Sequence, residues 1–237
     1  MGFIDLHSHV LPGIDDGAPD AATGLDMLRG LAAIGFERVC ATPHQKAGQF
    51  LPTADDIAAA EAALRAEGAL PCALTVAAEN MWDDVFYERS ARGAVPAYGA
   101  GPAFLVELPV THVPPGLLDR LFAFRVAGRL PVLAHPERYP ALCADDAALD
   151  RLRQTCALVV DLGAVAGYHG RRPGKLARRL VADGIAHAVA SDAHTPTDVR
   201  SAAEGIAWIR KKCGDAAVDR LLADHPRRIL AGELPDA

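Results

Sequence analysis

Residues 5–18 read DLHSHVLPGIDDGA and place two histidines two positions apart, directly behind an aspartate. The apolar neighbours Ile4 and Leu6 are typical of a buried strand. Because side chains alternate along a strand, His7 and His9 would point to the same side. The pair is either a coincidence or two nitrogen ligands for a metal ion, and the rest of the chain decides between these interpretations.

Length and composition predict one large domain over residues 1–237. Barrels of the α/β class reach ~200–250 residues without dividing, and the hydrophobic content of 51% supplies a core and argues against disorder. The net charge is −6, with 24 basic and 30 acidic residues and no basic block. This balance argues against nucleic acid as the main ligand.

Cysteine usage and hydropathy predict a cytoplasmic protein. No apolar run near ~18 residues and no basic-then-apolar leader is visible, so we expect no membrane insertion. The cysteines are odd in number, widely spaced and without a C-x-x-C motif, as in proteins that keep reduced thiols. They are Cys40, Cys72, Cys143, Cys156 and Cys213.

Short apolar runs rich in Val, Leu and Ile alternate with helical patterns along the whole chain. Strand followed by helix, repeated seven times, is the signature of parallel βαβ units. The expected strands cover 3–6, 38–42, 72–78, 103–108, 130–135, 157–163 and 186–191.

Helix boundaries are marked by capping residues and glycines. Thr53 with Asp56 three positions later predicts a helix start, and Gly68 predicts its end. Further helices are expected where apolar stripes precede Gly128 (Leu117, Leu118, Leu121, Phe122) and Gly184 (Leu176, Leu180, Val181), and over 197–213 and 215–231.

Six of the seven expected strands end in a histidine or an acid. The carboxyl ends of barrel strands converge on one face, so this pattern favours a closed (β/α) barrel over an open doubly wound sheet. The sixth strand offers only Asp161, which is more typical of a structural or supporting group than of a ligand. The strand-end residues are His7, His9, His44, Glu79, Glu107, His135, Asp192 and His194.

With one of Asp15 or Asp16, these candidates number nine, whereas one catalytic zinc uses about three protein ligands. The sequence therefore predicts more than one ion, and mixed imidazole and carboxylate ligands favour Zn, Mn or Fe over Ca or Mg. Four crowded carboxylates could not all ionise unaided. Two divalent ions would neutralise them, and three would leave a charge of about +2, suited to a phosphate dianion.

The motifs DLHSHVLPGIDDGA, ATPH, AAEN, VELP, AHPER and SDAH together resemble the PHP (polymerase and histidinol phosphatase) superfamily. Within it, they are most similar to the bacterial metal-dependent protein-tyrosine phosphatases of capsule and exopolysaccharide operons. The resemblance runs from about residue 3 to 231. It implies a distorted seven-stranded (β/α) barrel with three metal ions, commonly manganese, with iron or zinc as alternatives.

The resemblance also implies a role for each candidate. His7, His9, Glu79 and Asp192 match the ligands of a first metal; Glu79, Glu107 and His135 those of a second, with Glu79 bridging; Asp16, His44 and His194 those of a third. It thereby favours Asp16 over Asp15. Arg138 and Arg200 fall where the family places arginines that contact phosphate.

The function implied is hydrolysis of a phosphotyrosine protein, with a bacterial tyrosine kinase that controls polysaccharide export as the expected partner. Metal-bound water ionises near neutral pH, so we expect a metal-bridging hydroxide as nucleophile. A cysteine mechanism is excluded, because no cysteine has the required arginine six residues later. Two alternatives stay open: a small-molecule phosphomonoesterase, such as a histidinol-phosphate phosphatase, and a regulatory binding protein without catalysis.

Other polar features have simpler interpretations. Asp5 could orient a ligand imidazole from behind. The loop 167–175, with Arg171, Arg172 and Lys175, could engage an acidic phosphopeptide or be a solvated basic loop. His112, His187 and His225 lie off the strand-end pattern and are expected to be structural or solvated.

Overall fold

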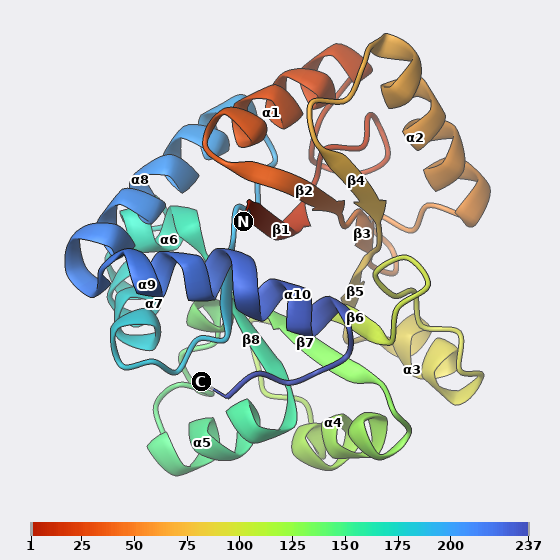
Figure 1. Cartoon of the computed structure of the whole chain (residues 1–237). Helices are drawn as coiled ribbons and strands as arrows, with labels where there is room; N and C mark the ends of the chain where they lie inside the picture. The colour runs from red at the N-terminus through yellow and green to blue at the C-terminus, as the bar shows by residue number, and fades with distance from the viewer. Residues whose placement is uncertain (1, 237) are drawn as a thin grey trace.

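A computed structural model describes residues 2–236 and shows parallel strands surrounded by helices (Figure 1). Every strand pair is parallel, in one sheet of order β1-β2-β4 and a second of order β3-β5-β6-β7-β8-β9. The strands within these residues are β1 (Phe3–Ser8), β2 (Phe36–Ala41), β3 (His44–Gln45), β4 (Ala73–Val76), β5 (Glu79–Met81), β6 (Ala103–Glu107), β7 (Leu130–Ala134), β8 (Ala157–Asp161) and β9 (Ala188–Ala190).

The two sheets form one distorted barrel, as the sequence predicts. The two sheets join where the chain passes from β2 to β3 and from β4 to β5. The Glu79 amide donates to Pro43 O at 3.1 Å across this junction. On the other side β9 returns to β1, because the Asp192 amide donates to His7 O and the His9 amide to Ala193 O, both at 2.9 Å.

The expected strands 38–42 and 72–78 correspond to β2 and β4. Each of them is followed by a short strand that the sequence did not predict, β3 after β2 and β5 after β4. Pro43 lies between β2 and β3, and proline has no amide hydrogen to continue a ladder. This accounts for the break before His44, whereas the break before Glu79 contains no proline.

The helices surround the strands, and α9 and α10 run across the front of the strands in the view of Figure 1. Their bounds are α1 (Ala21–Ala33), α2 (Ala54–Glu67), α3 (Asp84–Ala91), α4 (Leu117–Val126), a 3₁₀ turn η1 (Pro136–Arg138), α5 (Asp146–Thr155), α6 (Leu162–Ala166), α7 (Arg171–Ala182), α8 (Pro196–Cys213), α9 (Asp215–Asp219), a π-helical segment η2 (Arg220–Asp224) and α10 (His225–Leu230).

Most helix predictions are confirmed. The capping box before α2 is present, since the Thr53 amide donates to Asp56 Oδ2 at 2.8 Å and the Asp56 amide to Thr53 Oγ1 at 3.2 Å. The helices before Gly128 and Gly184 are α4 and α7, and α8 begins one residue before the predicted 197–213. Residues 215–230 are helical without a gap, as expected for 215–231, with the π-helical segment η2 between α9 and α10.

Two details of these predictions are wrong. Phe122 is 63% exposed and does not belong to the buried stripe of α4, whose third buried residue is Phe124. This agrees with helical spacing, since Leu117, Leu121 and Phe124 lie four and three residues apart. The basic residues of 167–175 are not in a loop, because α7 begins at Arg171.

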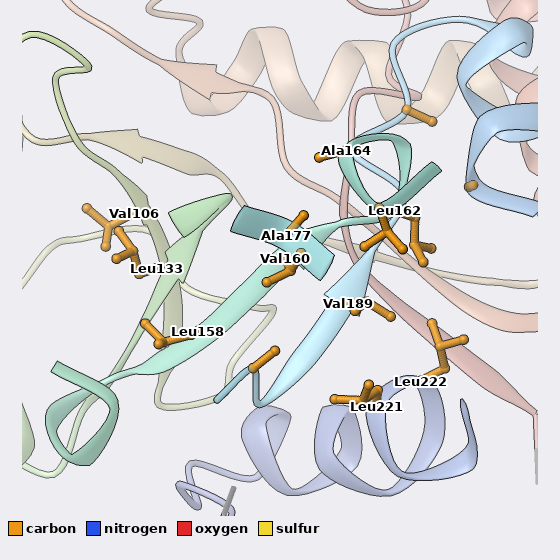
Figure 2. Packing of buried hydrophobic residues seen from close by; sticks show 14 of the residues in the cluster. Val106, Leu133, Leu158, Val160, Leu162, Ala164, Ala177, Val189, Leu221 and Leu222 are labelled. Atoms are coloured by element: carbon orange, nitrogen blue, oxygen red, sulfur yellow. The ribbon is translucent and has the colours of Figure 1, made fainter. Parts of the chain in front are cut away.

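Buried side chains form two layers, one inside the barrel and one between the strands and the helices. In β8, Leu158 and Val160 face the helices, as Figure 2 shows, whereas Ala157 and Val159 belong to the inner layer. Because side chains alternate along a strand, Asp161 at the end of β8 falls on the inner side. This alternation carries polar groups to the carboxyl rim of the barrel.

Candidate metal centre

Alternation and backbone geometry together deliver the predicted ligands to this rim. In β6, Ala103 and Leu105 belong to the inner layer, so Glu107 continues their side. His135 and Asp192 follow β7 and β9 and adopt φ values of 35° and 47°. Among residues 2–236, they are the only non-glycine residues with positive φ.

A left-handed backbone at a non-glycine residue costs energy of order 1–3 kcal/mol and is concentrated at functional sites. In this chain both instances belong to the group of predicted ligands. The conformation turns His135 Nε2 to within 2.8 Å of Glu79 Oε1. It also brings Asp192 Oδ1 to within 3.2 Å of His7 Nε2. The strain is therefore tied to the assembly of the cluster.

Glu79 lies at the centre of the cluster. Its Oε2 atom lies 3.0 Å from His44 Nδ1, 3.3 Å from His7 Nε2 and 3.5 Å from His9 Nε2. Its other oxygen contacts His135, as described above. One buried carboxylate thus touches four imidazoles from three other parts of the barrel, as a bridging ligand would.

All nine predicted ligands come together, in four overlapping groups whose ligand atoms lie within 4.8 Å of one another. The pairing of His7 and His9 on one side, expected from the opening stretch, is confirmed by a separation of 3.1 Å between their Nε2 atoms. The groups are His7, His9 and Asp192; His7, Glu79 and His135; His44, Glu79 and Glu107; and His9, Asp16, His44 and His194.

Contacts inside the cluster have separations that metal ligation would also produce. Two nitrogens bound to one ion at ~2.0–2.1 Å lie roughly 3.0–3.4 Å apart, which is the separation of the His7 and His9 nitrogens. His44 Nδ1 and Glu107 Oε1 are buried and form no hydrogen bond, although they lie 3.5 Å from each other and His44 Nδ1 lies 3.0 Å from Glu79 Oε2. Buried polar atoms without partners require an explanation, and a bound cation supplies one.

Protonation of the imidazoles follows from the same crowding. Burial alone would lower the pKa of His9, but the carboxylates of Asp15 and Glu79 raise it to about 10. Burial likewise opposes the protonation of His44, and Glu107 and Glu79 raise its pKa to about 11. The cluster thus attracts positive charge, and metal ions would replace these protons because an imidazole ligand must be neutral.

Asp15 and Asp16 have different positions. Asp15 Oδ2 accepts from the His44 amide at 3.1 Å and contacts His9 Nδ1 at 2.8 Å, so it holds two candidate ligands from behind. Asp16 is half-exposed and faces His44 Nε2 at 3.3 Å and His194 Nε2 at 3.5 Å. The geometry therefore agrees with Asp16 as a ligand, whereas Asp15 supports the candidate ligands His9 and His44.

Tyr139 supports the cluster from behind, whereas the predicted role of Asp5 is wrong. Tyr139 holds the second nitrogen of His135, with 3.2 Å between the hydroxyl and Nδ1. Asp5 does not orient an imidazole; instead its carboxylate accepts from the Ser191 amide at 2.9 Å and from the Ser191 hydroxyl. It therefore links β1 to the segment after β9.

The two predicted arginines are placed differently. Arg138 Nη2 lies 3.0 Å from Asp161 Oδ2 and also contacts Asp192 Oδ2, so it stands at the edge of the cluster. Arg200 is exposed on α8 and donates to Thr197 Oγ1 at 3.1 Å. In the described part of the chain it forms no ion pair with the cluster, and its role stays a prediction.

His169 is a neighbour of the site that the sequence did not single out. Its Nε2 atom lies 2.8 Å from Asp161 Oδ2, and its side chain is 41% exposed. The signal in the sequence was weak, because His169 lies in the connection between α6 and α7 and not at a strand end.

The histidines set aside by the sequence are structural or solvated, as predicted. His187 Nδ1 accepts from the Leu158 amide at 3.0 Å, and His225 Nδ1 donates to His187 O at 2.7 Å. His112 is exposed beside Thr111.

The closed parallel barrel, with buried imidazoles and carboxylates at its carboxyl rim, defines the class: a (β/α)-barrel protein with a candidate metal-binding site. The particular family follows from the sequence: residues 3–231 match the family described as capsular polysaccharide synthesis, CpsB/CapC, and the chain belongs to it.

Individual relatives agree with this family. The tyrosine-protein phosphatase YwqE of Bacillus subtilis is 31% identical over 197 residues, which cover 81% of this chain and 77% of YwqE. The tyrosine-protein phosphatase CpsB of Streptococcus pneumoniae is 26% identical over 252 residues, covering 98% of this chain and all of CpsB.

Comparison with solved structures gives a match to the same group of proteins. A crystal structure from work on YwqE and CpsB, described there as unique metal-dependent tyrosine phosphatases, matches with a TM-score of 0.84 at 25% identity, over 97% of this chain and 95% of the other. D-hydantoinase matches with a TM-score of 0.55 at 12% identity, over 100% of this chain and 73% of the other, and shows the fold alone. Across residues 2–236, none of the helices has the length and apolar character needed to cross a membrane.

Proposed function

We propose that this chain is a metal-dependent phosphotyrosine-protein phosphatase that acts on a bacterial tyrosine kinase controlling polysaccharide export. Membership of the CpsB/CapC family supports the activity, and its name supports the connection with capsular polysaccharide. The observation that carries the proposal is the convergence of four imidazoles on the carboxylate of Glu79.

Three divalent ions, manganese first among the candidates, would fit the cluster. His7, His9, Glu79 and Asp192 would hold one ion; Glu79, Glu107 and His135 a second; and Asp16, His44 and His194 a third. When bound, such ions supply a nucleophilic hydroxide at neutral pH and neutralise phosphate oxygens.

Solvent access is graded across the cluster, and this supports one direction of approach. The side chains of Glu79 and His9 are 1% and 0% exposed, whereas those of His194 and Asp16 are 25% and 49% exposed. A phosphate group would therefore reach the cluster from the side of Asp16 and His194.

The chain's own residues then have separate tasks. Arg138 already stands beside Asp192 and would hold a phosphate oxygen through its guanidinium, which spreads the negative charge of the transition state. Asp161 fixes the orientation of that guanidinium. Tyrosinate, with a pKa near ~10, is a moderately good leaving group.

Substrate comparison tests the proposal. The manganese-loaded protein should hydrolyse a phosphotyrosine peptide with a higher kcat/KM than histidinol phosphate, and excess chelator should abolish both activities. A preference for histidinol phosphate would favour a small-molecule phosphomonoesterase instead, and absence of turnover would favour a regulatory binding protein.

A substitution tests the site itself. His135→Ala should lower kcat/KM by more than about 100-fold, the upper loss typical of residues that merely support a ligand. Its circular dichroism should stay that of the wild type. The exposed His112→Ala is the matched control and should retain activity. Unchanged turnover in His135→Ala would refute the assignment.

A further inference from the structure

We propose that His169, oriented by Asp161, donates a proton to the leaving-group oxygen as the phosphate ester is cleaved. The inference rests on the proposed phosphatase function and assigns a proton donor to the same site. His169 contacts none of the nine predicted ligands, so its role is separate from metal binding.

The geometry joins His169 to the phosphate-facing edge of the cluster. One oxygen, Asp161 Oδ2, contacts both His169 Nε2 at 2.8 Å and Arg138 Nη2 at 3.0 Å. Arg138 in turn contacts Asp192. A histidine and an arginine are thus held side by side on one carboxylate, and the arginine connects them to the candidate ligand Asp192.

Asp161 itself is firmly held. Its side chain is 1% exposed, and its other oxygen, Oδ1, accepts from the Gly163 amide at 2.6 Å at the start of α6. A carboxylate fixed in this way selects Nε2 of His169 as the nitrogen that donates to it. Nδ1 is then the nitrogen that can pass a proton to a substrate.

Gly163 leaves room for this arrangement. A Cβ atom at that position would lie 2.9 Å from His169 Nε2 and 3.1 Å from Asp161 Oδ1, closer than side chains normally tolerate. The absence of a side chain at the first turn of α6 therefore permits the imidazole to reach the carboxylate.

The charges around the ring favour its protonated form. The hydrogen bond to Asp161 raises the pKa of His169; partial burial and Arg138 oppose this, and Asp192 adds to it. Asp161 lies at the end of β8, Arg138 in η1 and Asp192 in the segment after β9. A protonated imidazole at a half-exposed position suits a donor that must be reloaded by solvent after each turnover.

Water supplies the oxygen that bonds to phosphorus; one of its protons stays on the product phosphate and the other is released to solvent. The bond between phosphorus and the aryl oxygen breaks with its electron pair left on that oxygen. The proton on His169 Nδ1 moves to the aryl oxygen and gives a neutral phenol. The neutral imidazole then takes up one proton from solvent, which balances the proton released by the attacking water.

Leaving-group dependence tests the proposal. We compare wild type, His169→Asn and the control His112→Asn, all loaded with manganese, on phenyl phosphate and p-nitrophenyl phosphate. Phenolate needs a proton to leave easily because the pKa of phenol is near ~10, whereas p-nitrophenolate leaves without one. General acid catalysis contributes typically about 10²–10⁴-fold.

We therefore expect His169→Asn to lose about 100-fold or more in kcat/KM on phenyl phosphate and less than about 5-fold on p-nitrophenyl phosphate. The alkaline limb of its pH–rate profile on phenyl phosphate should also disappear, which a merely structural residue would not cause. Equal losses on both substrates, or no loss on phenyl phosphate, would overturn the inference while leaving the phosphatase function intact. A wild type inactive on both would overturn the two together.

Discussion

Two adjacent aspartates show how single residues divide the work of the site. Asp16 presents its carboxylate to His44 and His194 at the open side of the cluster. Asp15 turns inward and holds the His9 ring and the His44 amide. The repeated DD in the opening stretch is therefore one candidate ligand and one group that orients ligands, a distinction that the spacing alone could not make.

Removal of the supporting carboxylate should weaken metal binding without removing a ligand. Asp15→Ala should lower manganese affinity by about 10–100-fold, because outer partners of metal-bound histidines contribute losses of that size. Metal titration of the chelator-treated protein measures it. The exposed Asp26→Ala in α1 should leave the affinity unchanged, and an Asp15→Ala variant that binds as tightly as this control would contradict the role.

His187 should make the fold sensitive to acid. Burial lowers its pKa to about 3, so the folded chain keeps this ring neutral where the unfolded chain, with a pKa of about 6.5, binds a proton. Its contribution is full above pH 6.5 and is lost as pH falls from 6.5 towards 3, at up to about 1.4 kcal/mol per pH unit.

Urea unfolding of the metal-free protein at pH 7 and pH 5 measures this. From pH 7 to pH 5, the free energy of unfolding of wild type should fall by roughly 2 kcal/mol more than that of His187→Asn, whose side chain does not titrate. Equal losses in the two proteins would show that the ring does not carry the acid sensitivity.

At the scale of elements, helices with polar caps were predictable and breaks in strands were not. Thr53 and Asp56 mark the start of α2 by a local hydrogen-bonding pattern, and the structure has that pattern. The break between β2 and β3 and that between β4 and β5 depend on how the barrel closes, which involves residues far apart in the chain. The exposure of Phe122 likewise depends on which face of α4 meets its neighbours.

The capping box should stabilise the fold without affecting catalysis. Thr53→Ala removes the acceptor for the Asp56 amide and should lower the free energy of unfolding by about 0.5–2 kcal/mol. Thr53→Ser keeps the hydroxyl and should stay close to wild type. Chemical denaturation measures both, and kcat/KM should be unchanged; a catalytic loss in Thr53→Ala would mean that α2 also shapes the site.

Across the whole molecule, closure of the barrel and assembly of the site are the same event. β1 supplies His7 and His9, the segment after β9 supplies Asp192 and His194, and hydrogen bonds between Asp5 and Ser191 join the two across 186 residues of chain. Eight of the nine candidate ligands were predictable because strand ends of a barrel must converge, whereas Asp16 was favoured over Asp15 only by the family resemblance. The left-handed turns at His135 and Asp192 and the contact of His169 with Asp161 depend on the folded geometry.

The hydrogen bonds between Asp5 and Ser191, which close the barrel, should contribute measurably to the free energy of unfolding. Burial raises the pKa of Asp5 to about 6, and hydrogen bonds from Ser191 offset part of this cost. Ser191→Ala leaves a buried carboxylate oxygen without its hydroxyl donor, so we expect a loss of about 1–3 kcal/mol in the free energy of unfolding. Ser90→Ala on α3 is the control, and a Ser191→Ala variant as stable as that control would contradict the role of this contact.

An anomalous difference map from crystals grown with manganese tests the metal centre most directly. We predict three peaks at the carboxyl rim of the barrel, each among the nine residues, with Glu79 shared between two of them. Maps with no peak among the nine residues would contradict the proposed metal centre and the catalysis assigned to it.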